Sequence, residues 1–347
     1  MRAPCGSKPV ARTTSRSSLP SCSASSPWND AWPSASTRSG TRTPCCSKAT
    51  SRGSLFPLWT GSWQTSATAS NRSSRASTRS TTPDRIHRRL STTLYPPHEL
   101  GYSLYSSLHE AGHGLYEQGL DPQARGLARG VACSLGLHES QSRLWENQVG
   151  RSRAFWECWR ANTVATFPEL ASASVDDLWL ASNQMCPSMI RTEADEATYN
   201  LHILLRTELE RALIAGELDA ADLAAAWRER MRALLGIEPP DDRQGVLQDV
   251  HWSAGEFGYF PTYTLGNVYA AQLLESASAE LGDLEDLVQA GDFATLLGWL
   301  RQNVHRWGRT FRAAELMERI TGQPPGADAL LRRLTSKVDD LDHTMAS

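Results

Sequence analysis

The pentapeptide HEAGH at residues 109–113 restricts the fold of this chain more than any other feature. Side chains four residues apart project from one face of an α-helix, so His109 and His113 can bind the same metal ion only if this segment is helical. The intervening Glu110 then lies beside the open position of that metal. Leucines recur at helical spacing around the pentapeptide, at Leu100, Leu104, Leu108 and Leu115. The sequence therefore predicts an amphipathic helix with a metal-binding face.

A carboxylate 26 residues after His113 can complete the ligand set. Glu139, in the sequence His138-Glu139-Ser140, can supply an oxygen ligand from a second helix. Two imidazoles and one carboxylate leave the fourth position of a tetrahedral zinc ion free for water, as a hydrolytic site requires. We therefore predict a metallopeptidase site in which His109, His113 and Glu139 bind Zn²⁺. The alternative, two ordinary histidines on an amphipathic helix, does not account for Glu139.

Charge divides the chain into two unlike parts. Residues 1–92 contain 14 Lys and Arg against 2 Asp and Glu, a net charge of +12, whereas residues 93–347 carry a net charge of −15. The first part is rich in serine, threonine, arginine and proline and shows no sustained helical or strand period. Three interpretations stay open for it: translation out of the reading frame, a disordered segment, or a targeting segment. We expect the folded domain to span residues 93–347.

The second part consists of helix-forming segments joined by short loops, which predicts an all-α fold. The expected helices are 99–119, a helix holding Glu139 and continuing to about residue 165, then 176–185, 190–215, 220–235, 263–281, 284–290, 293–307, 313–320 and 327–341. No transmembrane run or signal-peptide core is visible, so we expect a cytoplasmic protein without a membrane partner. The acidic surplus argues against nucleic acid as a partner.

Four sequence blocks resemble the thermostable zinc carboxypeptidases of the carboxypeptidase Taq type. They are HEAGH, HESQ at 138–141, IRTEAD at 190–195 and GVLQDVHW at 245–252, with GYFPTY at 258–263 close behind. The resemblance extends over about three quarters of the chain. It implies a helical fold with a deep substrate groove, often a homodimer, and a bound Zn²⁺ for which Co²⁺ can substitute. It also implies hydrolysis of the C-terminal bond of peptides with a free C-terminal carboxylate, with broad specificity.

The resemblance suggests further roles. Glu110 would be the general base that takes a proton from the attacking water. Arg191 would bind the substrate carboxylate, because a guanidinium can hold a carboxylate with two hydrogen bonds; the alternative is a helix-surface arginine paired with Asp195. Donors to the oxyanion of the transition state could come from the irregular segment that follows. The candidates for that role are His251, Tyr259 and Tyr263, although either tyrosine could instead be packed with its hydroxyl on a backbone carbonyl.

Two signatures of this family are absent, and its members are considerably longer than this chain. The His-Pro-Phe motif and the Asp-x-Arg-x-x-Thr motif expected before the HEAGH helix do not occur. One alternative is therefore a catalytically impaired zinc-binding fragment that lacks the N-terminal part of the groove. An endopeptidase or aminopeptidase with the same ligands is a second alternative. The IRTEAD block argues against it, because an aminopeptidase needs acidic groups to capture an N-terminal amine.

Overall fold

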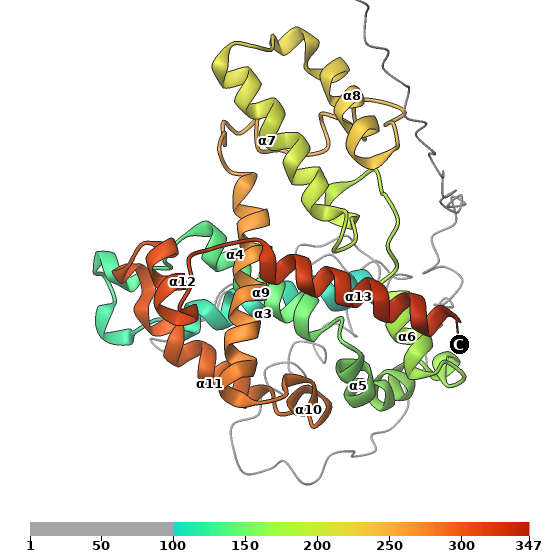
Figure 1. Ribbon diagram of the computed structural model, residues 1–347, viewed down its shortest axis with the longest axis vertical. Helices are drawn as coiled ribbons and strands as arrows, with labels where there is room; N and C mark the ends of the chain where they lie inside the picture. Colours follow the sequence, from blue (N-terminus) through green and yellow to red (C-terminus); the bar gives the residue numbers. More distant parts are fainter. Residues whose placement is uncertain (1–99, 347) are drawn as a thin grey trace, which may run out of the picture.

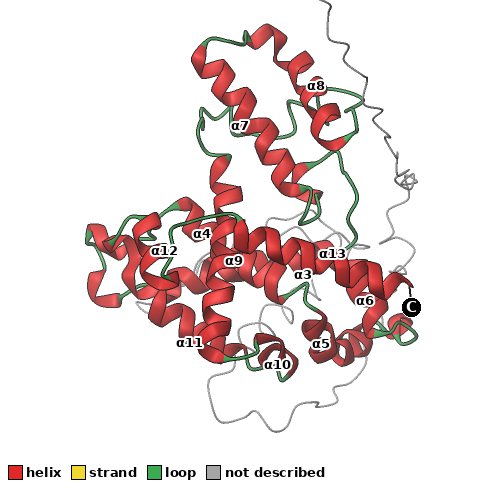
Figure 2. Cartoon of the chain, in the orientation of Figure 1, coloured by secondary structure: helices red, strands yellow, loops and turns green. Residues whose placement is uncertain are grey.

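The structure, a computed structural model, describes residues 100–346, which form helices joined by short loops (Figure 1). No strand occurs among the described residues, so the predicted all-α class is confirmed (Figure 2). No helix within 100–346 has both the length and the apolar character needed to cross a membrane. The predictions for residues 1–92 concern a segment outside the described residues.

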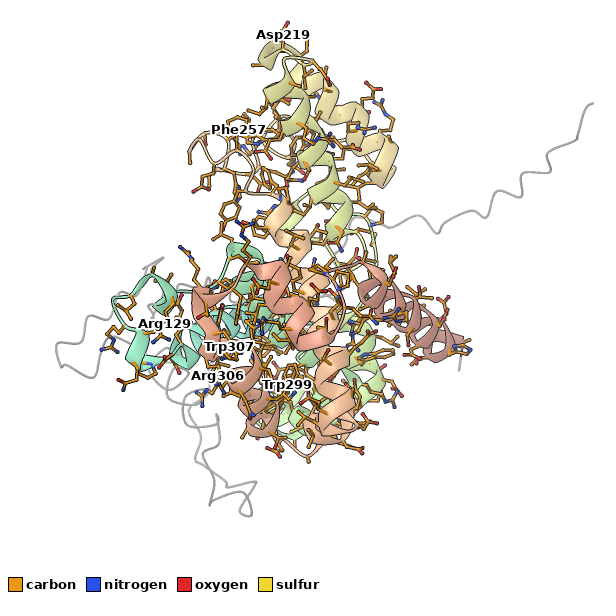
Figure 3. All side chains as sticks on the ribbon, turned by 60° about the vertical axis from the view of Figure 1, so that its left-hand side comes forward. Arg129, Asp219, Phe257, Trp299, Arg306 and Trp307 are labelled. Carbon is orange, nitrogen blue, oxygen red and sulfur yellow. The ribbon has the colours of Figure 1, made fainter. Side chains whose placement is uncertain are left out.

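The helices form a body and a smaller lobe above it. In the lobe, α7 and α8 lie beside the irregular segment 236–260, and α9 runs from the lobe down into the body (Figure 1). Asp219 lies at the tip of the lobe, and Arg129 lies at one edge of the body (Figure 3). The helices are α3 (Leu100–Gly119), α4 (Leu135–Arg143), α5 (Arg153–Thr166), α6 (Val175–Ser182), α7 (Tyr199–Ala215), α8 (Leu223–Leu235), α9 (Pro261–Leu281), α10 (Leu284–Gln289), α11 (Phe293–Asn303), α12 (Ala313–Thr321) and α13 (Asp328–Ala346).

The HEAGH helix lies in the middle of the body, as its apolar spacing predicts. Leu104, Leu108 and Leu115 of α3 are buried in the main core, where α4 and α9 also contribute side chains. The lobe has a small core of its own between α7 and α8, made of Leu205, Leu209, Trp227, Met231 and Leu235. Burial of these apolar faces is the main term that holds short helices together in water.

The long helix predicted from Glu139 to about residue 165 is wrong, because the chain forms three helical segments there. α4 ends at Arg143, a π-helical turn covers Leu144–Val149, and α5 begins only at Arg153. The Ser152 side chain accepts a hydrogen bond from the backbone N–H of Phe155, which starts α5 as a new helix. Periodicity alone could not reveal this break, since Trp145 and Trp156 are buried on both sides of it.

The helix predicted from about Ile190 also begins later, at Tyr199. The carboxylate of Asp195 accepts hydrogen bonds from the backbone N–H groups of Ala197 and Thr198, in place of a continuing helical ladder. Arg191 consequently lies on a short 3₁₀ turn, Arg191–Glu193, rather than on a helix. The alternative that pairs Arg191 with Asp195 on a helix surface is therefore wrong.

Candidate active site

Two glycines let the three helices of the site approach one another closely. A Cβ atom at Gly112 of α3 would lie 2.6 Å from the Cα of Ser142 on α4. A Cβ atom at Gly266 of α9 would lie 2.7 Å from the Cβ of Glu139 on α4. Real side chains essentially never show such contacts, so any larger residue would force the helices apart. The glycines therefore allow Glu139 to sit between α3 and α9, within reach of both histidines.

The three predicted metal ligands do come together. The Oε2 atom of Glu139 lies 3.6 Å from the Nε2 of His109 and 3.4 Å from the Nε2 of His113. Each residue offers one ligand atom, and these three atoms all lie within 4.8 Å of one another. Ligand atoms bound tetrahedrally to zinc at about 2.1 Å are separated by about 3.4 Å. The two carboxylate–imidazole distances thus agree with a zinc site, and imidazole ligands disfavour Mg²⁺ or Ca²⁺.

Contacts behind the ligands fix which atoms face the centre. His109 Nδ1 lies 2.8 Å from Glu146 Oε2, and His113 Nδ1 lies 3.1 Å from the backbone oxygen of His138. Both contacts favour a proton on Nδ1 and leave the Nε2 lone pair for a metal. Arg143 Nε donates to Glu139 Oε1 at 2.9 Å, which leaves Oε2 facing the histidines. The donor set therefore fits zinc in orientation as well as in distance.

Glu146 and Arg143 were not predicted from the sequence. Glu146 lies on the π-helical turn, where one extra residue per turn brings its carboxylate to His109. The only available signal was an acidic residue seven positions after Glu139 on a segment expected to be helical. No role was predicted for His138 either, yet its Nδ1 lies 2.6 Å from His113 Nδ1 and its Nε2 lies 3.0 Å from Glu117 Oε1.

Neighbouring side chains keep the two buried carboxylates ionised. Burial by itself would raise the pKa of Glu139, but His109 and Arg143 lower that pKa well below its usual range. Burial also opposes ionisation of Glu146, yet the charge of Arg143 and the hydrogen bond with His109 lower the pKa of Glu146 to about 2. At neutral pH both groups are therefore charged and can accept hydrogen bonds or a metal ion.

Arg191 lies in a buried cluster of charges rather than on an open surface. Its Nε and Nη2 donate to Asp249 Oδ1 at 3.0 and 2.6 Å, and its Nη1 donates to Tyr199 at 2.9 Å. Arg206, fully buried, donates from Nε to Asp249 Oδ2 at 2.7 Å. The cluster thus holds two guanidinium groups and one carboxylate. Burial and the charge of Arg191 lower the pKa of Arg206 to about 10, so both arginines are cationic at neutral pH.

The predicted oxyanion donors lie next to this cluster. His251 Nε2 is 2.9 Å from the hydroxyl of Tyr263, and the ring of Tyr259 lies 5.4 Å from that of Tyr263. Tyr263 precedes Gly266 by about one turn of α9, on the side that touches Glu139. Burial raises the pKa of Tyr263 and of Tyr259, and the nearby Glu139 carboxylate adds to the rise. Both hydroxyls are protonated donors at neutral pH.

Tyr199 connects the metal-binding residues with the arginine cluster. The guanidinium carbon of Arg143 lies 4.2 Å above the Tyr199 ring, while the Tyr199 hydroxyl accepts the hydrogen bond from Arg191. Glu110 is half-buried on α3 beside His109, and its carboxylate has no hydrogen-bond or ion-pair partner within residues 100–346. The structure therefore brings the predicted residues into two adjoining groups, with Glu110 next to the predicted metal ligands.

Comparison with known proteins identifies the family of this chain. Residues 79–338 match the family described as carboxypeptidase Taq (M32) metallopeptidase. The chain belongs to this family. The M32 relatives include thermostable carboxypeptidase 1 of Thermus thermophilus, 51% identical over 246 residues, and carboxypeptidase 1 of Bacillus subtilis, 37% identical over 251 residues. Among solved structures, the M32 carboxypeptidase of Deinococcus radiodurans is 48% identical and superimposes with a TM-score of 0.70.

The match with these M32 proteins is partial in length. It includes 71% of this chain but 48% of the Thermus protein, and 72% of this chain but 50% of the Bacillus protein. The Deinococcus structure is likewise covered over 50% of its chain. The chain therefore spans about half the length of the curated relatives it matches.

Proposed function

We propose that this protein is a zinc metallocarboxypeptidase that releases the C-terminal residue of peptides with broad specificity. The observation that carries the proposal is the adjacency of two groups of side chains: a His₂Glu ligand set and a buried cluster with a surplus positive charge. The first is the ligand chemistry of hydrolytic zinc sites. The second attracts an anion such as a C-terminal carboxylate. An endopeptidase or aminopeptidase would have no use for that positive charge.

His109, His113 and Glu139 would hold the metal, Zn²⁺ by preference and Co²⁺ as a substitute. A bound ion of this kind supplies Lewis acidity, which makes water nucleophilic at neutral pH. Glu110 takes the proton of the attacking water and passes it to the nitrogen of the leaving amino acid. The hydroxyl of Tyr263, held by His251, donates a hydrogen bond to the oxyanion, and Tyr259 is a second donor.

Carboxylate recognition rests on charge balance in the arginine cluster. Asp249 neutralises one of the two cations, Arg206 and Arg191, and leaves a net charge of about +1 in a region that water barely reaches. A substrate carboxylate would balance that charge. Of the two arginines, Arg191 is better placed to bind the substrate carboxylate. Tyr199 links it to the predicted metal ligands, and its guanidinium carbon lies 4.7 Å from the centre of the Tyr263 ring. Binding of the substrate terminus there places the preceding peptide bond toward the metal.

Hydrolysis of an N-blocked dipeptide by the zinc-loaded protein tests this function. The parent should release the C-terminal amino acid and should leave the same dipeptide untouched when its terminus is amidated. Glu110→Gln should retain zinc and lose turnover by about 10²–10⁴-fold. Arg191→Ala should raise KM strongly, whereas Arg211→Ala, which removes an exposed arginine from α7, should not. Equal cleavage of acid and amide substrates would refute carboxylate recognition.

A catalytically impaired zinc-binding fragment is the second candidate, and the half-length match with the relatives favours it specifically. One equivalent of zinc bound without any release of the C-terminal residue would identify that case. We further propose a cytoplasmic homodimer, in keeping with the family resemblance. Sedimentation equilibrium of the purified chain would test the dimer, and a single monomer mass would exclude it.

A further inference from the structure

One buried lysine is the hub of a polar cluster that the proposed mechanism does not use. Residues 93–347 contain 20 arginines but only one lysine, Lys337. It lies on α13, the last helix, with its side chain 6% exposed. Lysine is almost never buried this deeply without a partner, because its ammonium group is strongly hydrated. The ammonium group of Lys337 must therefore have partners inside the protein.

Lys337 has direct partners in two segments, and a third segment joins them through Glu196. Its ammonium group forms an ion pair with Glu196, whose side chain is 5% exposed, and donates to Asn183 Oδ1 at 3.0 Å. The other oxygen of Glu196 accepts a hydrogen bond from Gln148 Nε2 at 3.3 Å. Lys337, Glu196, Asn183 and Gln148 are named here the Lys337 cluster. Arg333, one turn earlier on α13, adds a hydrogen bond to the backbone oxygen of Gln148 at 3.3 Å.

Two of these segments belong to the two groups of the candidate active site. Gln148 lies on the π-helical turn that carries Glu146, the partner of His109. Glu196 follows the 3₁₀ turn that carries Arg191 by a few residues. α13 crosses the body below the lobe (Figure 1), and its Arg333 and Lys337 contact Gln148 and Glu196 respectively. The Lys337 cluster thus connects the segment next to the predicted metal ligands with the segment that carries Arg191.

We propose that Lys337 is a positioning residue that sets the spacing between the metal-binding side chains and Arg191. A carboxypeptidase must hold the substrate terminus at one fixed distance from the hydrolytic centre, and this inference rests on the proposed function. The segment 186–198 is mostly irregular; Asp249 and Tyr199 hold its Arg191, and Lys337 holds Glu196 near its end. Glu196 supplies the attachment point and Lys337 the fixed charge. Loss of the ion pair should let the segment 186–198 move and change the distance between Arg191 and the predicted metal ligands.

The test compares Lys337→Met with a matched control, Arg332→Met, which removes an exposed cation from the same helix. Lys337→Met should lower kcat/KM by roughly tenfold or more, mostly through KM, because small displacements of a positioned substrate are costly. Zinc affinity should stay within about twofold, since no ligand contact changes. The control should leave KM unchanged. A KM equal to that of the parent, or a parallel loss of zinc affinity, would overturn the proposal.

Two further measurements keep the proposal testable if the single variant folds poorly. Lys337→Met combined with Glu196→Gln removes both charges and should recover much of the thermal stability while KM stays high. Recovery of KM together with stability would mean that the pair serves folding alone. Hydrogen exchange separates this inference from the proposed function. Faster exchange confined to amides 191–198 supports the proposal even if the parent proves inactive, and uniformly faster exchange overturns it.

Discussion

Replacement of Gly112 by alanine should separate the two helices that carry the metal ligands. The new Cβ would lie 2.6 Å from the Cα of Ser142 and 2.8 Å from the carbonyl carbon of Gln141, and the Gln141 oxygen is closer still. All three are backbone atoms, so no side-chain rotation can relieve the contact. The Gln141 oxygen, at 2.4 Å, is the nearest of them, and ordinary contact begins at 3.4 Å, so α4 must retreat from α3 by about 1.0 Å.

The energetic cost follows from this displacement. Overpacking of a close helix contact costs about 1–3 kcal/mol, of which the higher helix propensity of alanine returns at most about 1 kcal/mol. Each kcal/mol corresponds to about 2–4 °C in Tm for a domain of this size. The retreat of α4 also moves Glu139 away from His109 and His113, which now lie 3.6 and 3.4 Å from its Oε2. Zinc affinity should therefore fall together with stability.

Gly114→Ala is the matched control on the same helix. A Cβ atom at Gly114 meets nothing within 4 Å, so the substitution should stabilise the protein by about 0.5–1 kcal/mol and leave zinc affinity unchanged. Thermal unfolding with and without zinc, and competition for zinc against a chromophoric chelator, measure both quantities. If Gly112→Ala behaved like Gly114→Ala in the two assays, the close approach of α3 and α4 would not be what forms the site.

Three other substitutions probe separate parts of the structure. Glu146→Gln should weaken zinc binding by about 10–100-fold, measured by the same competition assay, because it removes the carboxylate that orients His109. Tyr263→Phe should lower kcat by about 10²–10³-fold at unchanged zinc content, and a smaller effect would exclude it as an oxyanion donor. Burial lowers the pKa of His305 to about 3, so its folded form stays neutral while the unfolded form binds a proton below about pH 6.5. The contribution of neutral His305 to the free energy of unfolding is therefore complete above pH 6.5 and is lost as the pH falls toward 3. His305→Gln should reduce the acid-side slope of the unfolding free energy by about 1.4 kcal/mol per pH unit, measured by denaturant titration between pH 6.5 and 4.

Much of the metal centre could be predicted because its signals are local. The spacing of His109 and His113 has meaning within a single helix, and the apolar positions of α3 independently indicate that helix. Glu139 was predicted from the short block His138-Glu139-Ser140, which follows His113 closely in the chain. The prediction of an all-α fold likewise required only the period of apolar residues.

Contacts between distant segments were beyond the reach of the same reasoning. Arg191 meets Asp249 from 58 positions away, and this partner replaced the local one expected at Asp195. The break of the helix after Arg143 depends on the π-helical turn and the cap at Ser152, which periodicity does not register. In the Lys337 cluster, Lys337 contacts Asn183 from 154 positions away.

The sequence by itself therefore determined the helical class and singled out the candidate ligand residues and the chemistry that such residues can support. Only the tertiary structure decided how Glu139 is held, which partners Arg191 has, and how α13 joins the two sides of the site. The reason is physical. Helical spacing and residue type act over a few positions, whereas the orientation of a ligand or a charge depends on atoms that packing brings from elsewhere in the chain. Gly112 shows the difference, since the sequence contains the glycine but not the neighbouring helix that requires it.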